Sequence, residues 1–230
     1  MESLIQRDTI MLKRLLTITL VGVHLCAMTS CSDETVKCKH EIEIQPSGEY
    51  GKDATIWTEM PDRNIAHSNS LSVMAWTFYG IGFDEGVKRR LLAFDVTSIK
   101  DEADILKATL YLYNAADARD NWGAHSTRNG SNTCKLLPIT EPWLENTVTW
   151  NNQPATTSDG HVTIQASTDD HQDYTIDVTN LVKQWHVNPS DNNGVMVQLD
   201  VEQHYRALIF ATSDHTNPEL RPKLVVTYQN

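Results

Sequence analysis

Residues 108–113, Ala-Thr-Leu-Tyr-Leu-Tyr, alternate between small or aliphatic side chains and Thr or Tyr. Successive side chains of a β-strand point to opposite faces, so Ala and the two Leu would share one face and Thr and the two Tyr the other. We expect the first face to lie in the core and the second to be partly exposed. This pattern is typical of a strand in a sheet that is buried on one side.

Working outward, other short segments are also rich in β-branched, aliphatic or aromatic residues. Polar links rich in Asn, Asp, Gly, Ser and Pro join them, and some of the links are long, notably residues 74–88 and 115–133. Many short strands with almost no helical periodicity predict an all-β fold, an antiparallel β-sandwich that is jelly-roll-like. The expected strands are 71–73, 90–94, 147–150, 174–176, 195–199, 208–210 and 224–228.

One segment departs from this strand pattern. Leu181, Val182 and Trp185 fall at i, i+1 and i+4, which predicts a short helix near residues 178–187 with Trp185 in the core. Asp177 or Thr179 is expected to cap its exposed amides.

Composition restricts the function. The 230 residues include 19 Lys and Arg against 30 Asp and Glu, a formal net charge of -11. This charge has the wrong sign for binding nucleic acid phosphates or anionic lipid by electrostatics. With 40% hydrophobic residues the chain can build a core, which argues against intrinsic disorder.

The N-terminus carries an export pattern. Lys13 and Arg14 precede an apolar run of eleven residues, 15–25, which is too short for a helix to span a bilayer of about 30 Å. Residues 28–31, Met-Thr-Ser-Cys, resemble the lipobox of bacterial lipoproteins, so Cys31 is expected to carry the lipid anchor. Plain secretion, with cleavage after small residues, is the alternative.

This pattern divides the chain into three parts. We expect a signal peptide over residues 1–30, with Met11 as a possible true start, a lipidated tether over 31–52 and one domain over 53–230. The acidic triplet at 32–34 resembles a signal that sends lipoproteins to the outer face of the outer membrane. The prediction is an exported outer-membrane lipoprotein that faces the cell exterior and contacts the membrane through its lipid anchor only.

Five segments, in order, resemble the DNRLRE-domain family, part of which is classed as carbohydrate-binding module family 96. The resemblance covers nearly all of residues 53–228 and implies a β-sandwich jelly roll of secreted or surface proteins. It further implies glycan binding without catalysis, often beside polysaccharide-degrading enzymes. The segments are 53–56 with 61–64, 90–95 with 108–110, 143–154, 177–194 and 221–228.

The residues themselves also argue against an enzyme. The chain has no Gly-x-Ser-x-Gly elbow and no His-x-x-x-His or His-x-His spacing. The adjacent acidic pairs at 84–85 and 169–170 are interpreted as solvated loop charges, not as a catalytic pair.

Sugar binding requires flat aromatic faces together with polar groups that hold hydroxyls. Trp76 and Tyr79 lie in one of the long links, and Trp122 lies in the other, between Arg119 and Arg128. These five residues are the predicted glycan-binding set, provided that the two links converge at one end of the sandwich. The alternative is that each Trp folds back to cover the core.

Three smaller features stay open. Lys88-Arg89-Arg90 is a basic run that suits a uronate or sulfate, and Cys38 and Cys134 permit a disulfide in an exported protein. Asp169-Asp170 permits a calcium ion without requiring one, and no other cofactor is predicted.

The expected partners are a polysaccharide and the proteins that degrade or import it, with no nucleic acid. The competing hypothesis is a structural or adhesive surface module that binds a protein or the cell envelope.

Overall fold

The computed structural model describes residues 37–47, 51–78 and 83–230, which form two antiparallel β-sheets and one α-helix. The first sheet has the order β1-β12-β5-β9. The second has the order β6-β11-β3-β4-β10-β7-β8, and β2 also pairs with β4. The elements are β1 (Lys39–Ile44), β2 (Lys52–Trp57), β3 (Ser70–Phe78), β4 (Phe83–Ala93), β5 (Asp104–Leu112), η2 (Asp120–Gly123), β6 (Ser126–Thr127), β7 (Cys134–Pro138), β8 (Val162–Ile164), β9 (Tyr174–Asp177), α1 (Thr179–Val187), η3 (Pro189–Asp191), β10 (Val195–Leu199), β11 (Arg206–Ala211), η4 (Pro218–Leu220) and β12 (Lys223–Gln229).

Strand β5 confirms the alternation in the sequence. Ala108, Leu110 and Leu112 are buried, and Leu110 pairs in register with Leu224 on one side and with Ile176 on the other. The apolar faces of β5, β9 and β12 therefore lie together on the inner side of their sheet, as expected for strands with one buried face.

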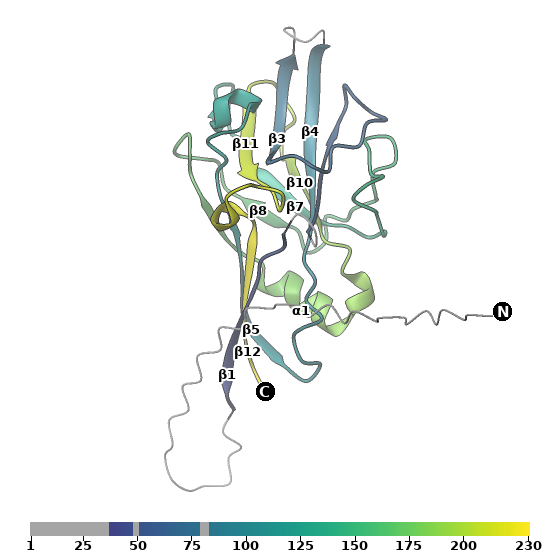
Figure 1. Ribbon diagram of the computed structural model, residues 1–230, viewed down its shortest axis with the longest axis vertical. Helices are drawn as coiled ribbons and strands as arrows, with labels where there is room; N and C mark the ends of the chain where they lie inside the picture. The colour runs from purple at the N-terminus through teal and green to yellow at the C-terminus, as the bar shows by residue number, and fades with distance from the viewer. Residues whose placement is uncertain (1–36, 48–50, 79–82) are drawn as a thin grey trace, which may run out of the picture.

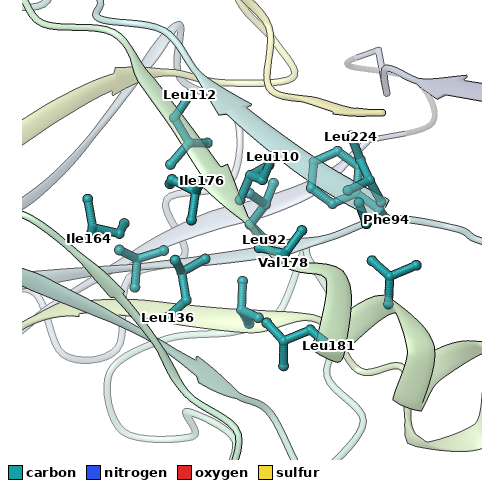
Figure 2. Packing of buried hydrophobic residues seen from close by; sticks show 14 of the residues in the cluster. Leu92, Phe94, Leu110, Leu112, Leu136, Ile164, Ile176, Val178, Leu181 and Leu224 are labelled. Atoms are coloured by element: carbon teal, nitrogen blue, oxygen red, sulfur yellow. The ribbon is translucent and has the colours of Figure 1, made fainter. Parts of the chain in front are cut away.

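The main core lies between the two sheets (Figure 2). Leu110, Ile176 and Leu224 of the four-stranded sheet belong to the same buried cluster as Leu92 and Leu136 of the other sheet. Burying apolar surface from both sheets is the main stabilising contribution to a sandwich.

Helix α1 packs at one end of this core, in the lower half of Figure 1. Leu181, Val182 and Trp185 are buried on it, which confirms the predicted helix and the core position of Trp185. The N-cap position is Val178 and no side chain caps the helix there, which differs from the prediction; Asp177, one residue earlier, accepts the backbone N–H of Thr179 at 2.9 Å and its hydroxyl at 2.6 Å.

Two expected elements differ in the structure. The link over 74–88 was expected to be a loop, but β3 continues to Phe78 and β4 begins at Phe83, so much of it is paired strand. The expected strand over 147–150 is a turn, because Thr149 donates its N–H and its hydroxyl to Asn152 Oδ1. Such local side-chain acceptors compete with strand pairing.

The expected tether also contains a strand. Residues 39–44 form β1, which pairs with β12 from Lys39 opposite Gln229 to Ile44 opposite Leu224. Ile42 is the buried residue of this strand, so the alternation visible in the sequence is short. The pairing is made by backbone groups, which the side-chain pattern does not reveal.

A smaller apolar cluster covers the opposite face of the eight-stranded sheet. Met74 lies between Val73 and Ala75, which belong to the main core, so it points to the outer face. There it meets Ala115 and Ala118 of the link that follows β5. This link therefore lies over the outer face of β3 and β11, and it carries η2, the short teal helical segment beside β11 in Figure 1.

Among the described residues, no helix is long and apolar enough to cross a membrane.

Candidate functional site

A cavity of about 390 Å³ opens where the link over 115–123 lies on the outer face of the sheet. Its wall is mostly polar and combines residues of β2, β3 and β4 with residues of two loops. The lining residues are Thr55, Ile65, Ser68, Asn69, Ser70, Ser72, Lys88, Asp117, Ala118, Arg119 and Asp120.

Strand periodicity explains why polar side chains reach this cavity. Ser70 and Ser72 alternate with buried Leu71 and Val73, so they share the outer face with Met74. Lys88 pairs in register with Met74 and therefore points to the same face. One face of two neighbouring strands thus presents two hydroxyls and an ammonium group to the cavity.

An ion pair crosses the cavity wall. Lys88 Nζ lies 2.7 Å from Asp120 Oδ2, and the Ser72 hydroxyl donates to the same oxygen at 2.5 Å. The ammonium group also lies 4.6 Å from the ring centre of Trp57, within the range of a cation–π contact. The Lys88 side chain is 11% exposed and that of Asp120 is 32% exposed, so the carboxylate is the more accessible partner.

A second ion pair lies two residues further along β4. Arg90 Nη2 is 3.3 Å from Asp53 Oδ2, and both side chains are 0% exposed. Asp53 Oδ2 also accepts the backbone N–H of Ser213 at 2.8 Å. Burial raises the pKa of Asp53 and lowers that of Arg90, whereas their mutual attraction acts in the opposite direction. This pair holds β2 to β4 and is closed to solvent.

One buried polar atom next to the cavity has no hydrogen-bond partner in the described part of the chain. Thr55 lines the cavity and is 3% exposed, and its Oγ1 is unpaired there. An unpaired hydroxyl at the cavity wall offers a donor and an acceptor to an incoming hydroxyl-bearing molecule.

Trp122 stands out from the surface two residues after Asp120. Its side chain is 89% exposed, although large aromatic side chains usually contribute most when they are buried. Its backbone is left-handed (φ 57°, ψ 32°), as is that of Asn121 (φ 44°, ψ 33°), and Gly123 follows at φ 75°. This conformation is unusual for a bulky residue and costs of order 1–2 kcal/mol.

Specific contacts hold this strained turn. Asn121 Nδ2 donates to the carbonyl of Ala124 at 2.8 Å, and Asn114 Nδ2 donates to the carbonyl of Gly123 at 2.8 Å. A Cβ atom at position 123 would collide with the backbone carbonyl of Ala116, so glycine is required there. The turn is therefore a fixed part of the fold that keeps Trp122 in solvent.

A buried histidine fastens the far side of the turn to β11. His125 Nδ1 accepts the backbone N–H of Ile209 at 3.0 Å, and its other nitrogen, Nε2, donates to the carbonyl of Gln172 at 2.8 Å. Burial lowers the pKa of His125, because the protonated ring would lose its solvation and its acceptor nitrogen.

The structure divides the predicted glycan-binding residues into two groups. Arg119 lines the cavity and Trp122 is exposed two residues after Asp120, which also lines it, whereas Trp76 and Arg128 both contact Tyr205. The Trp76 and Tyr205 rings meet edge-on at 5.2 Å, and the Arg128 guanidinium lies 5.2 Å from the Tyr205 ring centre.

Trp76 does not lie in a loop as predicted. It is half-buried on β3 and packs against the outer apolar cluster, because the segment around it is paired strand. Among the described residues no ring contact joins Trp76 to Trp122, and Trp76 instead meets Tyr205 edge-on. Tyr79 and Cys31 lie outside the described residues.

The basic run Lys88-Arg89-Arg90 is not an open anion site. Lys88 meets Asp120 and Arg90 meets Asp53, as described above. Arg89 forms two parallel bonds with Glu202, Nε to Oε1 at 2.7 Å and Nη2 to Oε2 at 3.0 Å. Each of the three cations therefore has its own carboxylate.

The two cysteines of the described residues, Cys38 and Cys134, lie in different environments. Cys38 is exposed before β1, whereas Cys134 is a fully buried free thiol at the start of β7. The disulfide that the sequence left open is therefore not formed, because Cys134 faces the main core. Burial raises the pKa of the Cys134 thiol far above its usual range, which keeps it protonated.

The open calcium question receives no geometric support from the described residues. They contain no group of three His, Cys, Asp or Glu side chains that would hold a metal ion. Asp169 Oδ1 accepts the backbone N–H of His171 at 2.8 Å, and the backbone carbonyl of Asp170 accepts that of His125 at 2.7 Å.

Sequence reasoning missed Asp120 and Ser72 as site residues and interpreted Lys88 only as part of a basic run. The alternation of Ser70 and Ser72 with apolar neighbours was the available signal, because it marks a polar face on a strand. The contact between Lys88 and Asp120 joins residues 32 positions apart, and no local pattern shows it.

Comparison with known proteins assigns most of the chain to a family. The model of carbohydrate-binding module family 96 matches residues 49–228, a range that includes the whole cavity and Trp122. No curated protein matches the chain.

Proposed function

Because the chain belongs to carbohydrate-binding module family 96, we propose that it is a non-catalytic cell-surface lipoprotein that binds a polysaccharide at the cavity and Trp122. Modules of this kind bind carbohydrate and do not catalyse its breakdown, in agreement with the sequence-based prediction that the chain is not an enzyme.

The exposed and strained Trp122 is the observation that carries this proposal. A flat indole in solvent can stack on the apolar CH face of a pyranose, and covering it with sugar removes apolar surface from water. A protein that needed Trp122 only for packing would bury it, whereas here three consecutive left-handed residues keep it outside.

The cavity supplies the polar half of the site. Its volume of about 390 Å³ lies within the usual range for small-ligand sites, roughly 300–1,000 Å³. Ser, Thr and Asn side chains and the Asp120 carboxylate are suited to sugar hydroxyls, and Arg119 adds a planar donor group. Stacking on Trp122 and hydrogen bonding in the cavity would act on adjacent parts of one chain of sugars.

The N-terminal pattern supports the location. Lipidation at Cys31 would anchor the domain through buried methylenes, without any basic patch. Displayed on the cell exterior, the module would hold polysaccharide near proteins that degrade or import it.

The test is gel retardation of residues 32–230 in a panel of soluble polysaccharides. Trp122→Ala should weaken retardation by about tenfold or more, because losing roughly 1.4 kcal/mol of stacking costs a factor of ten. Leu144→Ala is the matched control, since Leu144 is another exposed apolar side chain, 70% accessible and outside the cavity lining.

A second pair of variants separates the two groups of predicted residues. Arg119→Ala should weaken binding, whereas Arg128→Ala, which removes an exposed arginine at Tyr205, should not. Folded protein that no polysaccharide retards would overturn the proposal and favour an adhesive module that binds a protein or the cell envelope.

A further inference from the structure

We infer that Asp120 makes this site selective for neutral polysaccharides over polyuronates and sulfated glycans. The inference rests on the proposed function and adds the chemical class of the ligand.

The first argument is the charge of the cavity itself. Two cations, Lys88 and Arg119, and two carboxylates, Asp117 and Asp120, line it, so its formal charge is zero. A site for a polyanion needs an excess of positive charge, because complementary potential attracts the ligand and like charge repels it.

The second argument is the contact that Asp120 makes. Lys88 is the deeper of the two cations, and its ammonium lies 2.7 Å from Asp120 Oδ2. A uronate entering the cavity would have to compete with this carboxylate for Lys88 while sitting beside its negative charge. Asp117, which is 61% exposed at its side chain, adds a second negative charge at the cavity wall.

The third argument is that the neighbouring cations are engaged as well. Arg89 is bound to Glu202 and Arg90 to Asp53, so β4 offers no further positive charge to an anion. The chain as a whole carries a formal charge of -11, which opposes the approach of any polyanion.

The same arrangement suits a neutral sugar. Asp120 uses Oδ2 for both Lys88 and Ser72, and no hydrogen bond from another described residue reaches its Oδ1, which can therefore accept a sugar hydroxyl. Hydrogen bonds from hydroxyls to a carboxylate are short and roughly twice as strong as those between neutral groups. The ion pair with Lys88 holds the carboxylate in position for this contact.

The experiment uses residues 32–230 and gel retardation in galactomannan, arabinoxylan and mixed-linkage glucan as neutral polymers, with alginate, polygalacturonate and chondroitin sulfate as anionic ones. At least one neutral polymer should retard the wild type, and none of the anionic polymers should. Asp120→Asn keeps the shape of the side chain and changes the cavity charge from zero to +1. This variant should lose about tenfold in retardation by the neutral polymer and gain retardation by alginate.

Asp117→Asn is the matched control. It adds the same charge to the same cavity but leaves the Lys88–Asp120 pair intact, so it should gain much less alginate binding than Asp120→Asn. Thermal melting of each variant shows that it is folded. Equal gains for both variants would overturn the specific assignment to Asp120.

A measurement on the wild type alone keeps the inference testable if Asp120→Asn does not fold. Retardation by the neutral polymer should stay constant between about 0.05 and 0.5 M NaCl, a range over which charge screening strengthens several-fold. Binding that weakens steeply with salt, or wild type retarded by alginate as strongly as by any neutral polymer, would overturn the inference but leave the proposed function standing. No retardation by any polymer would instead overturn the proposed function and the inference with it.

Discussion

Lys88 and Arg90 lie two residues apart on β4, and each is paired with a carboxylate, but the two pairs occupy different environments. The Arg90–Asp53 pair joins two neighbouring strands and is closed to solvent. The Lys88–Asp120 pair joins a strand to the link that carries η2 and is partly open. An ion pair sealed between strands contributes to the fold, whereas one that is open to a cavity remains available to a ligand.

The largest expected effect comes from breaking the sealed pair. Arg90→Met leaves the Asp53 carboxylate buried without its cation, and removing one partner of a buried pair typically costs about 3–5 kcal/mol in the free energy of unfolding. Urea denaturation of residues 32–230 measures this loss.

The double variant Asp53→Asn, Arg90→Met is the control for that prediction. It removes both charges and retains an acceptor for the backbone N–H of Ser213, so it should be more stable than Arg90→Met alone. A loss below about 1 kcal/mol in Arg90→Met would mean that the two pairs are energetically alike.

The corresponding change in the open pair should act on binding rather than on stability. Lys88→Met should change the free energy of unfolding by no more than about 1 kcal/mol, because the pair is partly solvated. It should weaken polysaccharide retardation by about tenfold, since Asp120 loses the cation that positions it. Lys135→Met removes the lysine of the exposed Lys135–Asp200 pair and should alter neither property. A loss of stability as large as that of Arg90→Met would contradict the comparison.

Acid should lower the free energy of unfolding through His125, which fastens the link that carries Trp122 to β11. Its pKa in the folded state lies below the ordinary value of 6.5, so the unfolded chain binds the proton more readily. The contribution of the neutral His125 ring to the free energy of unfolding is fully present above about pH 6.5. It is lost as the pH falls toward the folded-state pKa, by at most about 1.4 kcal/mol per pH unit.

Urea titrations at a series of pH values between about 7.5 and 5.5 measure this dependence. The control is His125→Gln, which cannot titrate and should show a smaller slope over the same range. Equal slopes for the two proteins would show that His125 does not couple to folding.

The contrast between the two pairs also explains how far the sequence alone could lead. Local alternation predicted the sandwich and α1, because it depends on neighbours two or four positions away. The segment around Trp76 was interpreted as a loop, because its glycines conceal a strand whose pairing is made by the backbone. Arg119 and Trp122 stood out as large residues in a polar loop; Arg119 lines the cavity, and Trp122 is exposed two residues after the lining residue Asp120.

The cavity could not be predicted in the same way. It exists because the link after β5 folds back over Met74, and its charge balance depends on which carboxylate reaches which cation. Lys88 and Arg90 were interpreted as parts of one basic run, and only their partners, Asp120 and Asp53, distinguish them.

The smallest expected effect is a gain in stability, opposite in sign to the loss expected for Arg90→Met. Trp122→Gly should raise the free energy of unfolding by about 0.5–1 kcal/mol, because glycine adopts the left-handed backbone without the strain that Trp carries. The gain stays modest because glycine also increases the entropy of the unfolded chain. The same variant should lose polysaccharide retardation.

Asn121→Gly is the matched control for this last prediction, since Asn121 shares the left-handed backbone but tolerates it and donates to the Ala124 carbonyl. Urea denaturation of the two variants should therefore show a gain for Trp122→Gly and none for Asn121→Gly. A more stable protein that no longer binds is the result expected when a strained residue is kept for its ligand. A less stable Trp122→Gly would mean instead that the indole packs on the protein, and stacking on a sugar would no longer be needed to explain its position.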